Sequence, residues 1–322
     1  MVLVDGLLFL LACIFLVISG TGLVRSLLII GNFLRFSEFV VAFLIMGIST
    51  STPELFVGIT SALNKNSSLS LGNIIGANIL DLTLIAGLSI LLSNGIKVKK
   101  KVILRDSIFM IGVAMLPVIL MGLGNKLSRI DGIILILSFL LFNWHVYHHK
   151  REFRHTQQNH ISKISAISSP IIFIISLFAL FVSAHFVVQY GTKIAIGLNL
   201  PNIMIGLFLV SLGTTLPELA FELRAVKSKH PELAFGDLIG SIVTNSSLIL
   251  GLEAIINPIT ANFYVFLTSA VFMIIICFLF AAFVNGTKIS VMQGVSLILL
   301  YVFFVILELS IRGIIPAQTT LL

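Results

Sequence analysis

Long apolar runs with few charges, separated by short polar connections, occupy almost the whole sequence. Ten of these runs have the roughly 20 residues that a helix needs to cross a bilayer. Only 10% of the residues are charged, whereas soluble domains carry about 25%, so we expect an all-α integral membrane protein with ten transmembrane helices. The expected spans are 4–24, 38–63, 67–93, 106–124, 129–148, 167–190, 202–226, 232–256, 261–284 and 291–312.

The connections between these spans are short and carry most of the positive charge. The longest, residues 149–166, is polar but too small for a catalytic or regulatory domain. The connections after the odd-numbered spans share one side of the membrane and hold fifteen of the 20 lysines and arginines. The positive-inside rule then predicts a multi-pass plasma-membrane protein with both termini outside the cytoplasm. The basic charge reflects topology and requires no nucleic-acid partner.

The sequence repeats itself at an offset of 164 residues. ISTSTPEL (48–55) returns as LGTTLPEL (212–219), and LGNIIGANILD (71–81) returns as FGDLIGSIVTN (235–245). A single offset without gaps indicates two copies of one ancestral unit.

Each copy is expected to contain five spans. The first copy would occupy residues 1–148 and the second 167–322, with 149–166 as a cytoplasmic linker. Because five is odd, the second copy enters the membrane from the opposite side. Such inverted repeats are typical of secondary transporters, whose binding site lies at the midplane between the copies.

Each copy places a proline and a glutamate inside an apolar run. Pro53 and Pro217 lack an N–H and clash with the carbonyl four residues earlier, so each helix is predicted to break there. Broken backbone at membrane depth survives only where its carbonyl oxygens line a cavity or bind something. Glu54 and Glu218 follow directly, although an acid at the membrane centre costs roughly 2.5–3.5 kcal/mol on insertion scales. The matched acids therefore predict a functional site.

The polar groups near these breaks offer oxygen atoms as ligands. They are the carboxylates of Glu54 and Glu218, the hydroxyls of Ser49, Thr50, Ser51, Thr214 and Thr215, and the side chains of Asp81 and Asn245 from the next span of each copy. Oxygen ligands without His or Cys suit hard cations such as Ca²⁺ and Na⁺. Two glutamates neutralise one divalent ion, which favours Ca²⁺ as a substrate. Matched glycines at 72, 76, 236 and 240 predict close helix packing around these groups.

The paired motifs resemble the two α-repeats of the sodium/calcium exchanger family, prokaryotic type, in the cation/Ca²⁺ antiporter superfamily. The resemblance implies an antiporter that exchanges Ca²⁺ for Na⁺ by alternating access, without a cofactor, as a monomeric unit in the lipid bilayer. It also implies that the first and sixth spans slide as a pair. The implied ion ligands are Thr50, Ser51 and Glu54, then Thr214, Thr215, Glu218 and Ser241, the carbonyls of Gly47, Thr50, Ser211 and Thr214, and Asp81 and Asn245.

The sequence departs from the family pattern in the first copy. Ser49 replaces the usual Gly, Ala77 replaces a Ser whose hydroxyl serves a sodium site, and Asp81 replaces an Asn. Na⁺ is preferred as the coupling ion, but the change at Ala77 leaves H⁺ and K⁺ open.

Other polar residues allow two interpretations each. His145 and His149 lie one helical turn apart, a spacing that can bind metal, but a solvated loop also explains them. Glu222 fits either a helix-end pair with Arg224 or a vestibule for ions. Asp237, which aligns with Asn73, fits either packing or a place near the ion pathway.

Three other functions compete with Na⁺-driven exchange. A Ca²⁺/H⁺ (or K⁺-dependent) antiporter would use the same acids, and a passive cation channel also uses buried acids and carbonyls. Channels are usually built around a central axis from several subunits, whereas two internal copies here would build one site. An enzyme is not expected, since the sequence has no nucleophile–base pair, phosphate loop or His-containing metal motif.

Overall fold

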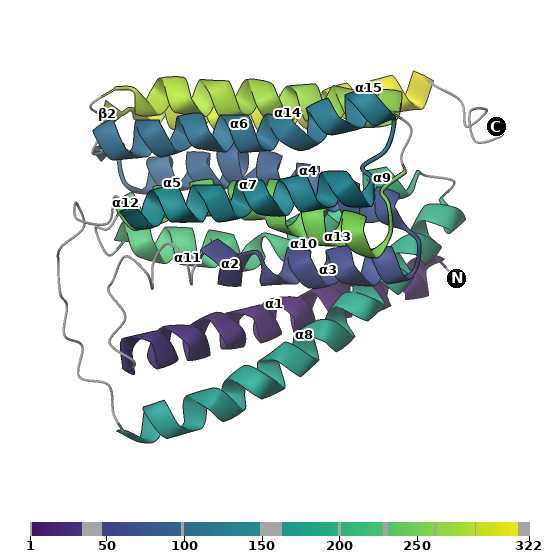
Figure 1. Ribbon diagram of the computed structural model, residues 1–322, viewed down its shortest axis with the longest axis horizontal. Helices are drawn as coiled ribbons and strands as arrows, with labels where there is room; N and C mark the ends of the chain where they lie inside the picture. Colours follow the sequence, from purple (N-terminus) through teal and green to yellow (C-terminus); the bar gives the residue numbers. More distant parts are fainter. Residues whose placement is uncertain are drawn as a thin grey trace.

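The computed structural model is a bundle of helices that run roughly side by side (Figure 1). It describes residues 2–33, 47–97, 100–148, 163–198, 201–227, 231–260, 263–286 and 288–314. The α-helices are α1 (Val2–Phe33), α2 (Gly47–Thr50), α3 (Thr52–Leu63), α4 (Ser67–Leu80), α5 (Ala86–Leu92), α6 (Lys100–Gly124), α7 (Arg129–His148), α8 (Lys163–Gly197), α9 (Asn202–Met204), α10 (Ser211–Thr214), α11 (Leu216–Lys227), α12 (Pro231–Val243), α13 (Leu250–Ile256), α14 (Phe263–Val284) and α15 (Val291–Ile314). Three π-helical segments, η2 (Asp81–Ile85), η4 (Ile205–Val210) and η5 (Thr244–Ile249), and two short strands, β1 (Ile96–Lys97) and β2 (Lys288–Ile289), complete the described chain.

Nine helices within these ranges are long and apolar enough to cross a membrane. The all-α membrane fold is thereby confirmed. The second predicted span, 38–63, is described only from residue 47, as α2 and α3. Most of the predicted linker, residues 149–162, also lies outside the described ranges.

The pair formed by α1 and α8 extends beyond the predicted spans. The 35 residues of α8 make a helix about 50 Å long, which exceeds the ~30 Å hydrocarbon core. The predicted spans cover only part of each helix, which continues to Phe33 in α1 and extends from Lys163 to Gly197 in α8. The two helices pack against each other, inclined to the other helices and at one edge of the bundle (Figure 1).

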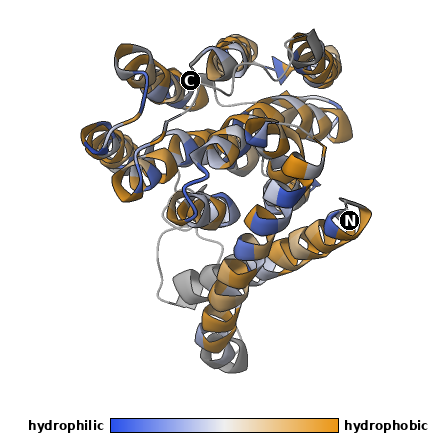
Figure 2. Cartoon of the chain, turned by 90° about the vertical axis from the view of Figure 1, so that its right-hand side faces the viewer, coloured by the Kyte–Doolittle hydropathy of each residue, from blue (hydrophilic) through white to orange (hydrophobic). Residues whose placement is uncertain are grey.

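Burial separates an inner layer of helices from an outer one. In the most apolar stretch of α4–η2–α5, 83% of the residues are buried, but only 22% are buried in that of α15. Outer helices expose large apolar side chains, such as Leu7, Phe15 and Phe178, as expected for contact with lipid. Apolar residues cover most of the helices in Figure 2. The inner layer is therefore where buried polar groups need a separate explanation.

The connections between helices meet at two opposite ends of the bundle. At one end β1 pairs with β2 in an antiparallel register that joins Ile96 with Ile289. At the other end Leu127 and Ile259 exchange two backbone hydrogen bonds of 3.0 Å. These contacts join connections of the first and second halves of the chain. In Figure 1, α1 begins and α15 ends at the edge opposite β2.

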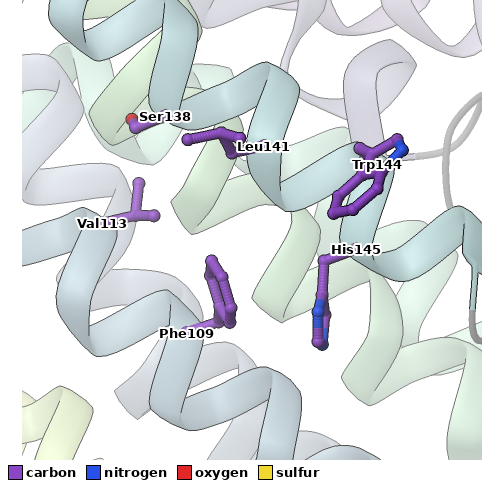
Figure 3. A pocket seen from close by; sticks show the side chains of 6 residues that line it. All are labelled: Phe109, Val113, Ser138, Leu141, Trp144 and His145. Carbon is purple, nitrogen blue, oxygen red and sulfur yellow. The ribbon is translucent and has the colours of Figure 1, made fainter.

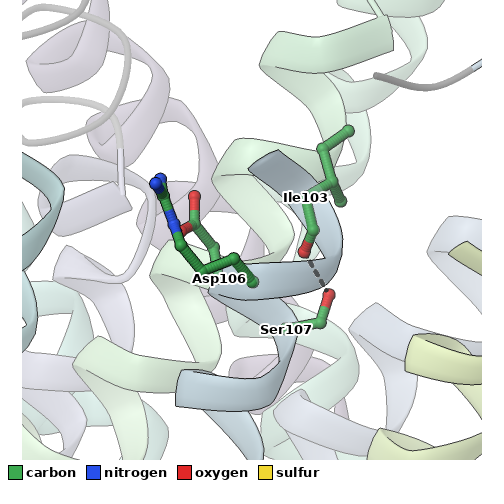
Figure 4. A network of polar contacts seen from close by, with 4 residues as sticks. Ile103, Asp106 and Ser107 are labelled. Atoms are coloured by element: carbon green, nitrogen blue, oxygen red, sulfur yellow. Dashed lines mark hydrogen bonds and ion pairs between the residues drawn. The ribbon is translucent and has the colours of Figure 1, made fainter. Parts of the chain in front are cut away.

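A polar network lies near the start of α6 (Figure 4). Arg105 Nε forms an ion pair of 3.0 Å with the carboxylate of Asp106, which lies next to it in the chain. The Ser107 hydroxyl donates a 2.7 Å hydrogen bond to the carbonyl of Ile103. The acid near the start of the fourth predicted span is thus paired with a neighbouring cation at the helix end.

The predicted close approach of helices at glycines is confirmed for α4. A Cβ at Gly72 would lie 2.2 Å from the Ile203 carbonyl oxygen, and a Cβ at Gly76 would lie 2.3 Å from that of Leu207. From the other side, a Cβ at Gly206 would lie 2.1 Å from the Leu69 carbonyl oxygen. Only glycine allows the backbones of α4 and of the α9–η4 segment to pack this closely.

We predict that Gly72→Ala lowers the thermal stability of the detergent-solubilised protein. The added methyl group would meet backbone that cannot move aside, and overpacking of this kind costs about 1–3 kcal/mol. Gly112→Ala on α6 is the matched control, because a Cβ there has nothing within 4 Å and alanine favours the helix. Equal melting temperatures for the two variants would contradict this packing.

Candidate functional site

Both predicted helix breaks are present, at corresponding residues. Ser51, with φ −77° and ψ 9°, separates α2 from α3, and Thr215, with φ −83° and ψ 0°, separates α10 from α11. Adding 164 to the bounds of α2 and α3 gives the bounds of α10 and α11. Each break comes two residues before the proline, so the proline falls in the first turn of the new helix, where its missing N–H costs nothing.

The two breaks converge on Gly20 of α1. A Cβ at Gly20 would lie 3.3 Å from Cγ of Pro53 and 3.4 Å from Cγ of Pro217. A larger residue at this position would push the two prolines apart. The breaks, which are distant in sequence, therefore form one structural centre.

Glu54 and Glu218 begin the helices that leave this centre. Both are buried, with 0% and 1% of their surface exposed, and they are close enough to repel each other electrostatically. Neither oxygen of Glu54 has a hydrogen-bond partner, and Glu218 Oε2 has none either. The Thr214 hydroxyl lies near the Glu54 carboxylate but donates to Asn73 and to the Ser211 carbonyl. Buried carboxylates without partners are costly, and a bound cation would offset that cost.

Corresponding threonines link each broken helix to the opposite half of the chain. Thr50 Oγ1 donates to Asp237 Oδ1 at 3.2 Å, and Thr214 Oγ1 donates to Asn73 Oδ1 at 3.1 Å. An offset of 164 converts one pair into the other. Thr50 also lies 3.3 Å from the hydroxyl of Ser241, for which the other half has only Ala77. By the offset of 164, Ala77 corresponds to Ser241 and Thr214 to Thr50, so the repeat assigns the missing hydroxyl to the surroundings of Thr214.

The helices that carry Asp81 and Asn245 change to π-helix at these residues. η2 begins at Asp81, and η5 begins at Thr244. The hydroxyls of Thr83 and Ser247, again 164 residues apart, both donate to the carbonyl four residues earlier. Single π turns are frequent at functional sites, and here they widen the backbone beside the predicted ligands. The sequence did not predict them.

Asp81 and Asn245 both keep unpaired oxygens. Neither carboxylate oxygen of Asp81 has a hydrogen-bond partner, and Asp81 is close enough to Glu54 and Asp237 to be repelled by both. Asn245 donates its amide to Asn78 Oδ1 at 3.0 Å, so its own Oδ1 faces no donor. The oxygens that a cation needs are thus available on both π-helical segments.

The oxygen atoms of the remaining predicted ligands differ in whether they already accept hydrogen bonds. Ser51 Oγ is buried without a partner. The Ser211 carbonyl already accepts hydrogen bonds from the Thr215 backbone N–H at 3.0 Å and from the Thr215 hydroxyl at 2.9 Å. An ion at Ser211 would have to displace these donors. Gly47, like Ser211, begins the short helix before its break.

No three His, Cys, Asp or Glu side chains of the described residues converge closely enough to hold a metal ion by themselves. A cation at this site would therefore need hydroxyl, amide and carbonyl oxygens in addition to carboxylates. Such a mixed oxygen set is typical of Na⁺ and Ca²⁺ sites.

Three buried acids near the site were not among the predicted ligands. Asp237 faces Thr50 and has an unpartnered Oδ2, and its alignment with Asn73 was the available signal. Glu222 and Glu253 are both 0% exposed. Neither aligns with an acid in the other half, so the repeat gave no signal for them.

The histidine pair considered as a metal site receives no support from the described residues. The ring of His145 stacks on Phe109, with 4.8 Å between ring centroids. It lines a pocket between α6 and α7 with Val113, Leu141 and the exposed Trp144 (Figure 3). His149 lies outside the described residues. The pocket is apolar apart from Ser138 and His145, and it is unsuited to a hard cation.

Comparison with known proteins identifies the family. The family profile described as sodium/calcium exchanger protein matches residues 5–148 and 168–309. The chain is 27% identical to the sodium/calcium exchanger MaX1 of Methanosarcina acetivorans, over 95% of this chain and 99% of that protein. It is 30% identical to the uncharacterized membrane protein MJ0091 of Methanocaldococcus jannaschii, over 83% of this chain and 85% of that protein.

A solved structure agrees with these sequence matches. The sodium-calcium exchanger NCX_Mj, soaked with Na⁺ and Sr²⁺, superposes with a TM-score of 0.68 at 26% identity, covering 95% of this chain and 99% of that one. The profile match spans nearly the whole chain and includes both broken helices, and members of this family are transporters. This chain is a member of the sodium/calcium exchanger family.

Proposed function

We propose that this protein is a secondary antiporter that exchanges Ca²⁺ for Na⁺ by alternating access. The observation that carries the proposal is the convergence of Pro53 and Pro217 on Gly20, which brings the unpaired acids Glu54 and Glu218 to one buried centre. Family membership supports cation exchange in general. The chemistry of the oxygens supports Ca²⁺ as one substrate.

The proposed ion ligands are the predicted ones, joined by Asp237. They are Glu54, Glu218, Asp81, Asn245, Thr50, Ser51, Thr214, Thr215, Ser241 and the carbonyls of Gly47, Thr50, Ser211 and Thr214. Together with Asp237 they include four carboxylates that repel one another when no cation is present. One Ca²⁺, or several Na⁺ ions in its place, would reduce this repulsion, so the two substrates compete for the same oxygens.

We also propose ten spans in two inverted repeats, residues 1–148 and 167–322, joined by 149–166. The matched bounds of the broken helices and the crossed hydrogen bonds of Thr50 and Thr214 support this architecture. Because both copies lie in one chain, a monomer holds a complete site. Fifteen of the 20 basic residues fall in or next to the connections after the odd-numbered predicted spans, and two of these connections contain β1 and β2. This supports a cytoplasmic location for the β1–β2 end and extracytoplasmic termini in the plasma membrane.

The mechanism follows from the cost of moving uncompensated charge. An empty site would carry several carboxylates past an apolar barrier, which is expensive in a membrane. Bound Ca²⁺ or Na⁺ reduces the net charge and permits the switch, so exchange is obligatory. The pair α1 and α8 is proposed to slide over the inner helices, since it lies at the edge of the bundle and meets both breaks through Gly20. Each ion biases the states only through its different affinity for them.

One observation favours a second candidate, a Ca²⁺/H⁺ or K⁺-dependent antiporter. Ala77 leaves Thr214 without the hydroxyl neighbour that Ser241 gives to Thr50. A sodium site that loses an oxygen ligand binds Na⁺ more weakly, and another coupling ion could then take over.

Flux under imposed gradients tests the function directly. In proteoliposomes that hold the purified protein, we expect radiolabelled Ca²⁺ uptake to follow an outward Na⁺ gradient and to stop when Na⁺ is equal on both sides. Uptake that follows a pH or K⁺ gradient instead would favour the second candidate. Uptake without any counter-ion would identify a channel.

We predict that Glu54→Gln and Glu218→Gln each reduce Na⁺-driven Ca²⁺ uptake by about 100-fold or more. Each change keeps the side-chain volume but removes a charge from the divalent site, a loss of about 3–5 kcal/mol. Monodisperse elution of both variants from gel filtration would control for folding. Near-normal uptake in both would remove the basis of the proposal.

We predict that Asp237→Asn keeps the fold and weakens Ca²⁺ binding about tenfold. Asparagine already makes the corresponding contact in the other half, between Asn73 and Thr214, so the hydrogen bond to Thr50 should persist. The lost charge removes an interaction worth about 1.5–3 kcal/mol. Ca²⁺ titration of the purified variant measures the change, and an unaltered affinity would mean that Asp237 only supports Thr50.

A further inference from the structure

Two fully buried glutamates, Glu222 and Glu253, lie outside the proposed ligand set. The offset of 164 aligns Glu222 with Gly58 and Glu253 with Ser89. Both acids therefore lie in the second half of the chain, but at different helix pairs: Glu253 on α13, which packs against α3, and Glu222 on α11, which packs against α5. The offset of 164 relates α3 to α11 and α5 to α13, so each of these two corresponding helix pairs holds one acid. Neither acid has an acidic counterpart at the aligned position, so the repeat by itself does not explain them.

Glu253 lies against the face of α3 that carries Glu54. Ser70 donates a 2.7 Å hydrogen bond to Glu253 Oε2, whereas Oε1 has no partner. A Cβ at Gly58 would lie 3.7 Å from Glu253 Oε2 and 3.4 Å from Ser70 Oγ, so the missing side chain of Gly58 leaves room for this pair. Gly58 is one turn beyond Glu54, a rise of about 6 Å along the helix.

Ser61 adds an independent polar group on the same face of α3. It follows Gly58 by three residues and Glu54 by seven, which places all three on one side of the helix. Its hydroxyl is fully buried and has no hydrogen-bond partner. A buried hydroxyl without a partner costs stability, so the fold alone gives no reason to keep it.

The corresponding helix pair, α11 and α5, also holds buried polar groups without hydrogen-bond partners. Both oxygens of Glu222 and the hydroxyl of Ser89 are buried without partners. Glu222 follows Glu218 by one turn and is close enough to Asp81 and Asp237 to interact with them electrostatically. From the central breaks, α3 runs toward one end of the bundle and α11 toward the opposite end (Figure 1). The two acids therefore flank the central site on opposite sides.

We propose that Glu253, Ser70 and Ser61 form a second cation site on the route between the central site and the end of α3, and that Glu222 with Ser89 serves the same purpose toward the end of α11. One carboxylate with hydroxyl oxygens balances one positive charge, so the ligand is a monovalent hard cation of the Na⁺ class. Ca²⁺ needs six to eight oxygen ligands and more than one acid. The inference rests on the proposed exchange.

Sided transport measurements test these flanking sites. In inside-out and right-side-out vesicles, we expect Glu253→Gln to raise the Na⁺ concentration for half-maximal Ca²⁺ exchange about tenfold at one membrane face only. Glu222→Gln should give the same shift at the opposite face. The control is Glu308→Gln, which neutralises a buried membrane glutamate that is bonded to Ser269 and Thr268 on the outer helices and should shift neither face.

Ser61→Ala is a second variant of the site near Glu253, and it tests that site even if the glutamate variants do not fold. Removal of a hydroxyl without a partner should leave thermal stability unchanged or higher, yet raise the half-maximal Na⁺ concentration about threefold at the same face as Glu253→Gln. Suppose that wild-type vesicles exchange Ca²⁺ for Na⁺. The flanking sites are refuted if the half-maximal Na⁺ concentration of every variant matches that of wild type, or if it rises equally at both membrane faces. If wild-type vesicles show no Na⁺-driven exchange, the proposed function itself fails.

Discussion

The structure depends on the burial of carboxylates that the protein does not pair. Glu54 and Asp81 have no hydrogen-bond partner for either oxygen, although each is at most 1% exposed inside an apolar bundle. Groups of this kind cost several kcal/mol unless an opposite charge joins them. A fold that keeps them must recover that cost when it binds a cation. In the proposed exchange, ion binding and the change of conformation both follow from this uncompensated charge.

Close backbone packing makes this imbalance possible. Gly72 and Gly206 let α4 and η4 approach until no Cβ fits between them, and Gly20 lets both broken helices meet on α1. Small residues at contacts of this kind replace the hydrophobic driving force that is absent between helices in lipid. The result is a closely packed inner layer that holds the acids, beside an inclined outer pair, α1 and α8.

Sequence reasoning predicted the parts of the site that obey local rules. Proline chemistry located both breaks to within two residues, and the repeat paired their bounds correctly. It did not predict the partners of Thr50 and Thr214, because a hydrogen bond between halves depends on how the copies dock. The π turns at Asp81 and Thr244, and the hydrogen bonds on the Ser211 carbonyl, depend on tertiary packing in the same way. The repeat gave no support for Glu222, for which two interpretations stayed open, or for Glu253, because a comparison of the copies finds only what both share.

The position of a bound ion tests the central claim most directly. Sr²⁺ has the charge and oxygen preference of Ca²⁺ and scatters more strongly, so its site can be located in crystals of this protein soaked with the ion. The account predicts one strong peak between Glu54 and Glu218, within ligand distance of both carboxylates (about 2.3–2.6 Å for Ca²⁺, slightly longer for Sr²⁺). A peak that contacts only one of the two glutamates, or that lies away from both breaks, would contradict it.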